Sequence, residues 1–233
     1  MSLIQNPDLP SPQGLYDPVM EHDSCGVNFL ADLQGRRSHQ IVSTAIAALC
    51  QLQHRGALGA ESNTGDGAGI LIQVPDKFLR QVVNFELPEA GAYATGIAFM
   101  PQDETNFQQA TNQILAFAKT LNINILGWRD VPINSSFLGQ GALGTMPKFS
   151  QIFLSANDDK GNELSGIDLD RKAFILRKKC EQEIQFEQID VSNQGMGGMS
   201  KTHQGVYFPS LSCRTLVYKG MLTTPQLGEF YLD

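Results

Sequence analysis

The amino-acid sequence predicts an α+β domain in which packed β-sheets carry helices on their outer sides. Two observations lead to this prediction. Apolar residues recur at helical spacing in some segments and cluster as short strands in others. The two kinds of segment alternate only in part, and several strands come in pairs, which favours packed sheets over a simple parallel winding.

The N-terminal half begins with a proline-containing leader at residues 1–24, followed by a buried strand predicted at Cys25–Asp32. After a turn at Gln34–Arg36, a helix is predicted from Ser38 to His54, which Ser38 can cap and Gly56 can end. The next predicted elements are a strand at Gly69–Val74, a short helix from Asp76 to about Val83, and a strand at Tyr93–Met100.

The C-terminal half continues with a helix that Asp103 caps and that runs to Leu121, because its apolar residues share one face. The remaining predicted elements are strands at Ile123–Trp128 and Gln151–Ser155, a turn at Asn157–Gly161, a helix from Asp168 or Asp170 to about Gln185, and strands at Gly205–Phe208 and Ser212–Tyr218. The last residues, Gly228–Asp233, have neither a helix stop nor a polar tail, and are typical of a chain cut within a domain.

Composition excludes several classes of function. The chain has 233 residues, is 42% hydrophobic and carries a net charge of −7 without any basic block, so nucleic acid is not an expected partner. The leader lacks an apolar core and has no Lys or Arg, unlike a signal peptide. No stretch approaches the length of a membrane span.

Four cysteines are present, Cys25, Cys50, Cys180 and Cys213, and no two have C-x-x-C spacing. Zinc ribbons, redox pairs and iron–sulfur runs are therefore unsupported in this chain, and a reducing, cytoplasmic setting is expected. The sequence places Cys50 in the core, Cys180 at a half-buried helix position and Cys213 in a strand.

Cys25 has two interpretations. A buried strand cysteine is common for this residue type. Alternatively, removal of residues 1–24 would make Cys25 the first residue, with a thiol and a free α-amine on one residue. The amine has a pKa of about 8, so its neutral fraction is a competent base for a thiol whose pKa is about 8.5.

A second group of residues is Gln53-His-Arg-Gly-Ala57 followed by the glycine-rich Gly65-Asp-Gly-Ala-Gly69. The glycines can form a phosphate-binding nest or, more simply, a tight helix-to-strand connection. Arg55 can cap the helix C-terminus or carry a fixed positive charge into a pocket.

Together these residues resemble one family, the large subunit of glutamate synthase, at its N-terminal glutamine amidotransferase domain. The stretches that carry the resemblance are Tyr16-Asp-Pro with Glu21-His-Asp-Ser-Cys-Gly-Val27, Gln53-His-Arg-Gly-Ala57 with Gly65-Asp-Gly-Ala-Gly-Ile-Leu71, Leu126-Gly-Trp-Arg-Asp-Val-Pro132, and Ser212-Cys-Arg-Thr-Leu-Val-Tyr-Lys-Gly-Met-Leu222.

The resemblance implies a class II amidotransferase domain at residues 25–233 with the N-terminal-nucleophile hydrolase fold, an αββα four-layer sandwich that is incomplete at the C-terminus of this chain. It implies removal of residues 1–24 as a propeptide, and attack by Cys25 on the side-chain amide of L-glutamine through a γ-glutamyl thioester. The products would be glutamate and ammonia, and the ammonia would be channelled to 2-oxoglutarate to make a second glutamate.

The resemblance also implies what lies elsewhere. The glutamine-binding arginine and the Asn-Gly pair of the oxyanion hole are expected beyond residue 233, with Arg55 as a supporting residue here. FMN and an iron–sulfur cluster belong to the full-length enzyme, so this segment is expected to hold no cofactor or metal. The other expected partners are the remainder of the synthase polypeptide and an electron-donor subunit or ferredoxin. Because loss of one oxyanion donor typically costs about 10²–10³ in rate, the isolated chain is expected to be nearly inactive.

Two alternatives remain at this stage. One is a stand-alone N-terminal-nucleophile amidohydrolase that acts on another amide. The other is a non-catalytic scaffold or binding module, which is motivated by the missing pocket residues and by Asn28, where the family usually has glycine.

Overall fold

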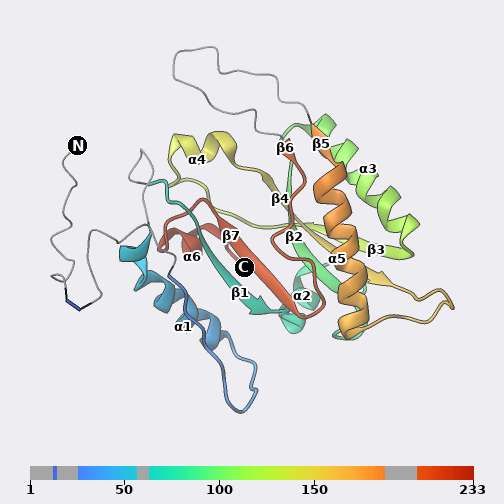
Figure 1. Cartoon of the computed structure of the whole chain (residues 1–233), viewed down its shortest axis with the longest axis horizontal. Helices are drawn as coiled ribbons and strands as arrows, with labels where there is room; N and C mark the ends of the chain where they lie inside the picture. Colours follow the sequence, from blue (N-terminus) through green and yellow to red (C-terminus); the bar gives the residue numbers. More distant parts are fainter. Residues whose placement is uncertain (1–12, 15–25, 57–62, 187–203) are drawn as a thin grey trace.

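The computed structural model describes residues 13–14, 26–56, 63–186 and 204–233 (Figure 1). The elements in chain order are α1 (His39–Cys50), η2 (Gln53–Arg55), β1 (Ala68–Gln73), α2 (Asp76–Val82), β2 (Ala94–Met100), α3 (Glu104–Thr120), β3 (Ile123–Asp130), α4 (Gln140–Thr145), β4 (Lys148–Ala156), α5 (Gly166–Glu183), β5 (Gln185–Phe186), β6 (Gln204–Gly205), β7 (Thr215–Gly220) and α6 (Gln226–Phe230).

The strands form antiparallel sheets. β4 lies between β2 and β3 in a three-stranded sheet, β1 pairs with β7, and β5 pairs with β6. The segment before β7 lies along the outer edge of β2, through bridges that join Tyr207 to Phe99 and Ser212 to Thr95. Antiparallel strands with helices outside them match the predicted α+β class.

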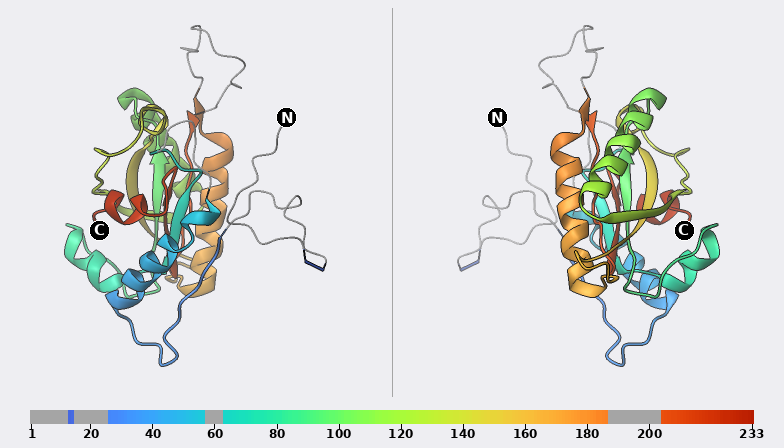
Figure 2. Two further views of the ribbon diagram at one scale, coloured as in Figure 1. Left: turned by 90° about the vertical axis from the view of Figure 1, so that its left-hand side faces the viewer. Right: turned by 90° about the vertical axis from the view of Figure 1, so that its right-hand side faces the viewer.

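The central strand β4 is buried on both faces. On one face Ile152 and Leu154 pack with α3 and α5 in the largest core cluster. On the other face Phe149 packs with residues of β7 and α6, and Phe153 packs with Leu79 of α2. Helices therefore cover both sides of the sheets, and Figure 2 shows α5 and α2 at opposite sides of the molecule.

Most of the predicted elements are present, with shifted ends. Asp103 caps α3 as predicted, since its Oδ1 accepts the N–H of Asn106 at 2.9 Å. The helix predicted from Ser38 is divided into α1 and the 3-10 turn η2, and its apolar face is only half-buried. α5 begins at Gly166, before either predicted start.

The strand predicted at Cys25–Asp32 is wrong over its described part, residues 26–32, which form no strand. Val27 and Phe29 are 86% and 92% exposed. The apolar run itself was identified correctly. A strand also needs a neighbour to accept its backbone hydrogen bonds, and within the described residues this run pairs with none.

Short elements were missed for a different reason. The helix α4 contains two glycines, and α6 lies in the tail that was interpreted as a cut end. Both pack against the β7 side of the core through Ala142, Leu227 and Phe230. Tertiary packing, rather than helix propensity, therefore accounts for these helices.

Gly96 is held by close approach of another backbone. A Cβ atom at this position of β2 would lie 2.1 Å from the carbonyl oxygen of Ser210. We predict that Gly96→Ala lowers the free energy of unfolding by about 3 kcal/mol, because the strand and the neighbouring segment must separate. Urea-induced unfolding measures this change.

Gly144→Ala is the matched control. A Cβ atom at Gly144, in α4, has no heavy atom within 4 Å, so this variant should gain up to about 1 kcal/mol through helix propensity. Equal stability of the two variants would contradict the close contact at Gly96.

Candidate active site

Cys25 lies outside the described residues, so its geometry stays a prediction. The residues after it, 26–32, form neither helix nor strand and lead into the turn at Asp32. Asp32 stabilises this turn by accepting the N–H groups of Gln34 and Arg36. The side-chain hydrogen bond from Arg36 and these backbone donors lower the pKa of the Asp32 carboxyl. The turn predicted at Gln34–Arg36 is confirmed.

Arg55 is the last residue of η2, and Gly56 follows it in an extended conformation. Its position at the end of the helical region is as predicted. The two roles weighed for its side chain, a cap or a charge in a pocket, both remain predictions.

The glycine-rich loop at residues 65–69 is a tight connection. A Cβ atom at Gly65 would lie 2.6 Å from the carbonyl oxygen of Leu222, and Gly67 has a φ of 141°, which other residues rarely adopt. Because protein backbone fills the space beside Gly65, the loop brings β1 against β7. This arrangement favours the connection over a phosphate nest.

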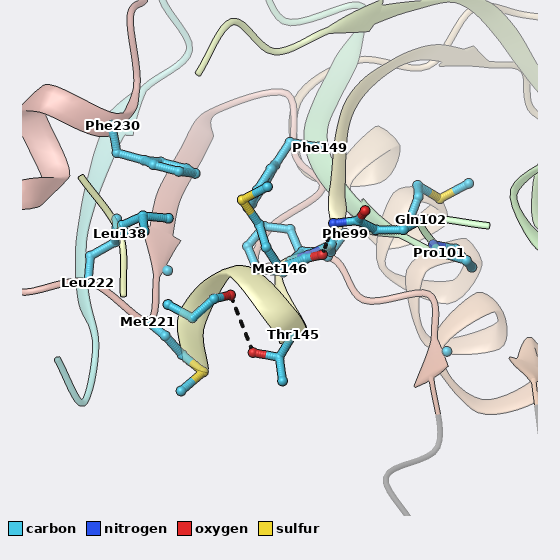
Figure 3. Close-up of a pocket in the computed structure, with 15 residues that line it drawn as sticks. Phe99, Pro101, Gln102, Leu138, Thr145, Met146, Phe149, Met221, Leu222 and Phe230 are labelled. Atoms are coloured by element: carbon cyan, nitrogen blue, oxygen red, sulfur yellow. Dashed lines mark hydrogen bonds between the residues drawn. The ribbon is translucent and has the colours of Figure 1, made fainter. Parts of the chain in front are cut away.

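A cavity of about 300 Å³ lies between α4, the end of β2 and the segment after β7 (Figure 3). Its lining is mostly apolar and includes the aromatic rings of Phe99, Phe149 and Phe230 and the side chains of Met146 and Met221. None of its lining residues is a Cys, His, Asp, Glu, Lys or Arg. The cavity therefore has no side chain suited to acid–base catalysis.

A buried polar cluster lies between the two larger sheets, and sequence reasoning missed it. Arg129 of β3 donates to Gln151 Oε1 at 2.8 Å and forms a two-pronged ion pair with Asp233, one contact of which is 3.0 Å. Tyr218 Oη donates to the same carboxylate at 3.0 Å, and Gln151 donates to Thr95 Oγ1 at 3.0 Å.

The burial of this cluster makes each hydrogen bond consequential. The side chains of Arg129 and Asp233 are only 11% and 6% exposed. Burial, together with the charge of Asp233, raises the pKa of Tyr218, so its hydroxyl stays a donor at neutral pH. The charged and polar side chains named above all have hydrogen-bond partners, and the ion pair joins Asp233 to β3. This is a structural role rather than a catalytic one.

A bulge in β3 places Arg129 in this cluster. The pairing with β4 shifts between Ile125 and Gly127, so Ile125 faces α3 and α5, as Trp128 does after the bulge. Arg129 then points to the opposite face, across from Gln151. Sequence alternation alone does not show a bulge, and Asp233 is 104 positions away along the chain.

The other cysteines are structural. Cys180 is fully buried in α5, not half-buried as predicted, and burial raises its thiol pKa to about 12. Cys213 precedes β7; burial and a hydrogen bond with Asp170 raise its pKa to about 11. Cys50 is half-buried at the end of α1, 3.9 Å from the carbonyl oxygen of Thr224. At neutral pH Cys180 and Cys213 are therefore protonated and unsuited to nucleophilic attack.

Within the described residues, no helix has both the length and the apolar character needed to cross a bilayer. The same part of the chain contains no cluster of three or more His, Cys, Asp or Glu side chains placed to hold a metal ion.

Comparison with known proteins assigns the class. The family described as "Glutamine amidotransferases class-II" matches residues 25–233, which is most of the chain. The chain therefore belongs to the class II glutamine amidotransferases, as the sequence resemblance indicated.

Its relatives are glutamate synthases. It is 39% identical over 226 residues to the glutamate synthase (NADPH) large chain of Bacillus subtilis, and 34% identical over 234 residues to the glutamate synthase (NADH) of Saccharomyces cerevisiae. A ferredoxin-dependent glutamate synthase 1 of Arabidopsis thaliana is 33% identical over 243 residues. These alignments cover 97%, 97% and 99% of this chain but only 14%, 10% and 14% of the relatives.

Removing one partner of the buried ion pair should be costly. We predict that Arg129→Ala lowers the free energy of unfolding by about 3–5 kcal/mol, because the Asp233 carboxylate stays buried without its counter-charge. The double variant Arg129→Ala, Asp233→Ala should recover part of the loss. Chemical denaturation of the single and double variants measures both effects.

Arg171→Ala provides the control for the same residue type. Arg171 pairs with Asp168 on the surface, with side chains 70% and 60% exposed, so its loss should cost no more than about 1 kcal/mol. Similar losses for Arg129→Ala and Arg171→Ala would show that the cluster contributes nothing beyond a surface pair.

Proposed function

We propose that this chain is the glutaminase part of a glutamate synthase, with Cys25 as its nucleophile. One observation carries the proposal: the family match begins at Cys25 and leaves residues 1–24 outside. A match that starts at a cysteine is what a processed N-terminal nucleophile requires. We therefore also propose that residues 1–24 are a propeptide.

The chemistry of the other cysteines supports this assignment. Cys180 and Cys213 have thiol pKa values raised to about 12 and 11, and Cys50 lies at the end of a helix beside a backbone carbonyl. A catalytic thiol needs a base or a lowered pKa. The free α-amine that processing would give to Cys25 provides a base without any other side chain.

The proposed reaction is a two-step acyl transfer. The sulfur of Cys25 attacks the side-chain carbonyl carbon of L-glutamine, while the α-amine accepts the thiol proton. Collapse of the tetrahedral intermediate breaks the C–N bond, and the protonated amine returns the proton to the departing ammonia. The γ-glutamyl thioester that remains is hydrolysed by water, which releases glutamate and restores the thiol.

We assign Arg55 a supporting role near the substrate, because it ends a helical segment directly before the loop that leads into β1. The groups that bind glutamine and form the oxyanion hole are proposed to lie beyond residue 233 of the full polypeptide. FMN and the iron–sulfur cluster belong to other parts of the full-length enzyme.

In the full enzyme we propose that the ammonia passes to 2-oxoglutarate. The relatives include an NADPH-linked synthase at 39% identity and a ferredoxin-dependent synthase at 33% identity. Either an electron-donor subunit or ferredoxin could therefore supply the electrons. A reducing, cytoplasmic setting is part of this proposal, and its support is the cysteine usage of the sequence.

The proposed fold is the four-layer sandwich of N-terminal-nucleophile hydrolases. Its support is the order of packing: α3 and α5 cover one face of the β2-β4-β3 sheet, and the β1-β7 sheet packs on the other face. Helix α1 contacts β1 beyond it. Exposed Val27 and Phe29 would complete the arrangement by gaining a neighbouring strand.

The alternatives have weaker support. Asn28 is exposed, so it does not crowd the segment beside the nucleophile. This weakens one of the two motives for a non-catalytic scaffold; the other, the missing pocket residues, is unaffected. The three relatives described above are all synthases, which favours a synthase segment over a stand-alone amidohydrolase.

The decisive test is made in a full-length glutamate synthase large chain that carries this segment. We predict that Cys25→Ser lowers glutamine hydrolysis at least about 10³-fold, because the weaker nucleophile cannot form the thioester. Synthesis of glutamate from added ammonia should be unchanged. A glutamine-analogue electrophile should label Cys25 in the parent protein, and the mature N-terminus should be Cys25.

Cys50→Ser is the control, and it should retain glutamine hydrolysis. Full hydrolysis by Cys25→Ser, or an active enzyme that retains residues 1–24, would overturn the proposal.

A further inference from the structure

The outward face of helix α5 carries three large apolar side chains. Ile167, Phe174 and Ile175 are 50%, 55% and 51% exposed. Ile167 and Phe174 are seven residues apart, which is two helical turns, so they share one face. The opposite side of the same helix is buried through Leu169, Ala173, Leu176 and Cys180. These three exposed residues are called the α5 patch below.

Cations beside the α5 patch are paired within the helix, and Lys178 shares the carboxylate of Glu181 with Arg177. Arg171 pairs with Asp168 at 2.6 Å, and Lys178 pairs with Glu181 at 2.8 Å. The patch therefore presents apolar side chains between charged groups that already have partners. Such a surface suits an uncharged apolar partner better than an acidic or basic one.

The size of the α5 patch indicates which kind of partner fits. Three half-exposed side chains offer on the order of 250 Å² of apolar surface, far below the roughly 800 Å² per partner of a stable complex between separate proteins. A contact between parts of one polypeptide needs less, because the covalent link gives a high effective concentration.

Such a polypeptide exists in the relatives. The aligned segment is 14% of the Bacillus subtilis large chain and 10% of the yeast enzyme, so most of each relative lies outside it. We infer that the α5 patch is the surface on which the rest of a glutamate synthase large chain packs against this segment. The inference rests on the proposed function, because it takes its partner from there.

The site for comparison is Val82, an apolar residue at the end of α2. It is 38% exposed, less than Phe174, and α2 lies at the opposite side of the molecule from α5 (Figure 2). In this structure a probe should therefore reach position 174 at least as easily as position 82.

The experiment compares Phe174→Cys and Val82→Cys in a full-length large chain that carries this segment. Maleimide labelling is followed by peptide mass spectrometry, so that native cysteines are resolved separately. We expect Cys at position 174 to react at least about tenfold more slowly than at position 82, because reaction there requires local opening. In the 233-residue chain the order should be equal or reversed.

Two results would overturn the inference. Position 174 labels as fast as position 82 in the full-length chain if nothing covers the patch. Slow labelling of Cys at position 174 in the 233-residue chain that becomes fast on dilution would show that a second copy of the chain covers the patch instead. Labelling requires no catalysis, so the outcome is independent of whether Cys25 proves to be the nucleophile.

A second variant tests the consequence for activity. Phe174→Glu places a carboxylate within reach of Arg171 and Lys178, which should preserve the helix while removing the apolar contact. Relative to Val82→Glu, it should lower glutamine-dependent glutamate synthesis at least about fivefold while glutamine hydrolysis is retained. Unchanged coupling in Phe174→Glu would count against the assignment.

Discussion

The burial of β4 on both of its faces is the constraint on which the other layers depend. A strand covered on both sides must be apolar in both directions, and Lys148–Ala156 satisfies this with Phe149 and Phe153 on one face and Ile152 and Leu154 on the other. Its one buried amide, Gln151, is tolerated because Arg129 and Thr95 complete its hydrogen bonds. Helices on one side and a second sheet on the other follow from this strand.

Secondary structure could be predicted from the sequence where a segment's own residues determine it. Asp103 and the apolar face behind it define α3, and the short, largely apolar run that ends at Met100 defines β2. The strand predicted after Cys25 was wrong because a strand needs a hydrogen-bonded neighbour as well as suitable side chains of its own. The ion pair between Arg129 and Asp233 could not be predicted from local sequence, because the two residues are 104 positions apart and Arg129 follows a bulge.

The candidate site was reached by chemistry and resemblance more than by periodicity. The sequence alone does not distinguish the four cysteines by reactivity, but the structure distinguishes three of them by burial. Burial raises the thiol pKa of Cys180 and Cys213, so both stay protonated at neutral pH, and Cys50 is half-buried. The family match starts at Cys25, and the proposal assigns the nucleophile to this residue. The apolar cavity beside α4 does not compete, because no ionisable side chain lines it.

The bulge in β3 also limits how this part of the chain can change during evolution. Because one extra residue is accommodated between Ile125 and Gly127, Trp128 faces the helices and Arg129 faces the opposite side, rather than the reverse. Deleting a single residue upstream would exchange the two directions, turning the indole toward Asp233 and the guanidinium toward the helices. Insertions or deletions between Ile123 and Trp128 should therefore be retained in evolution only when they add or remove an even number of residues. An odd change would turn Trp128 and Arg129 to the wrong faces of the sheet.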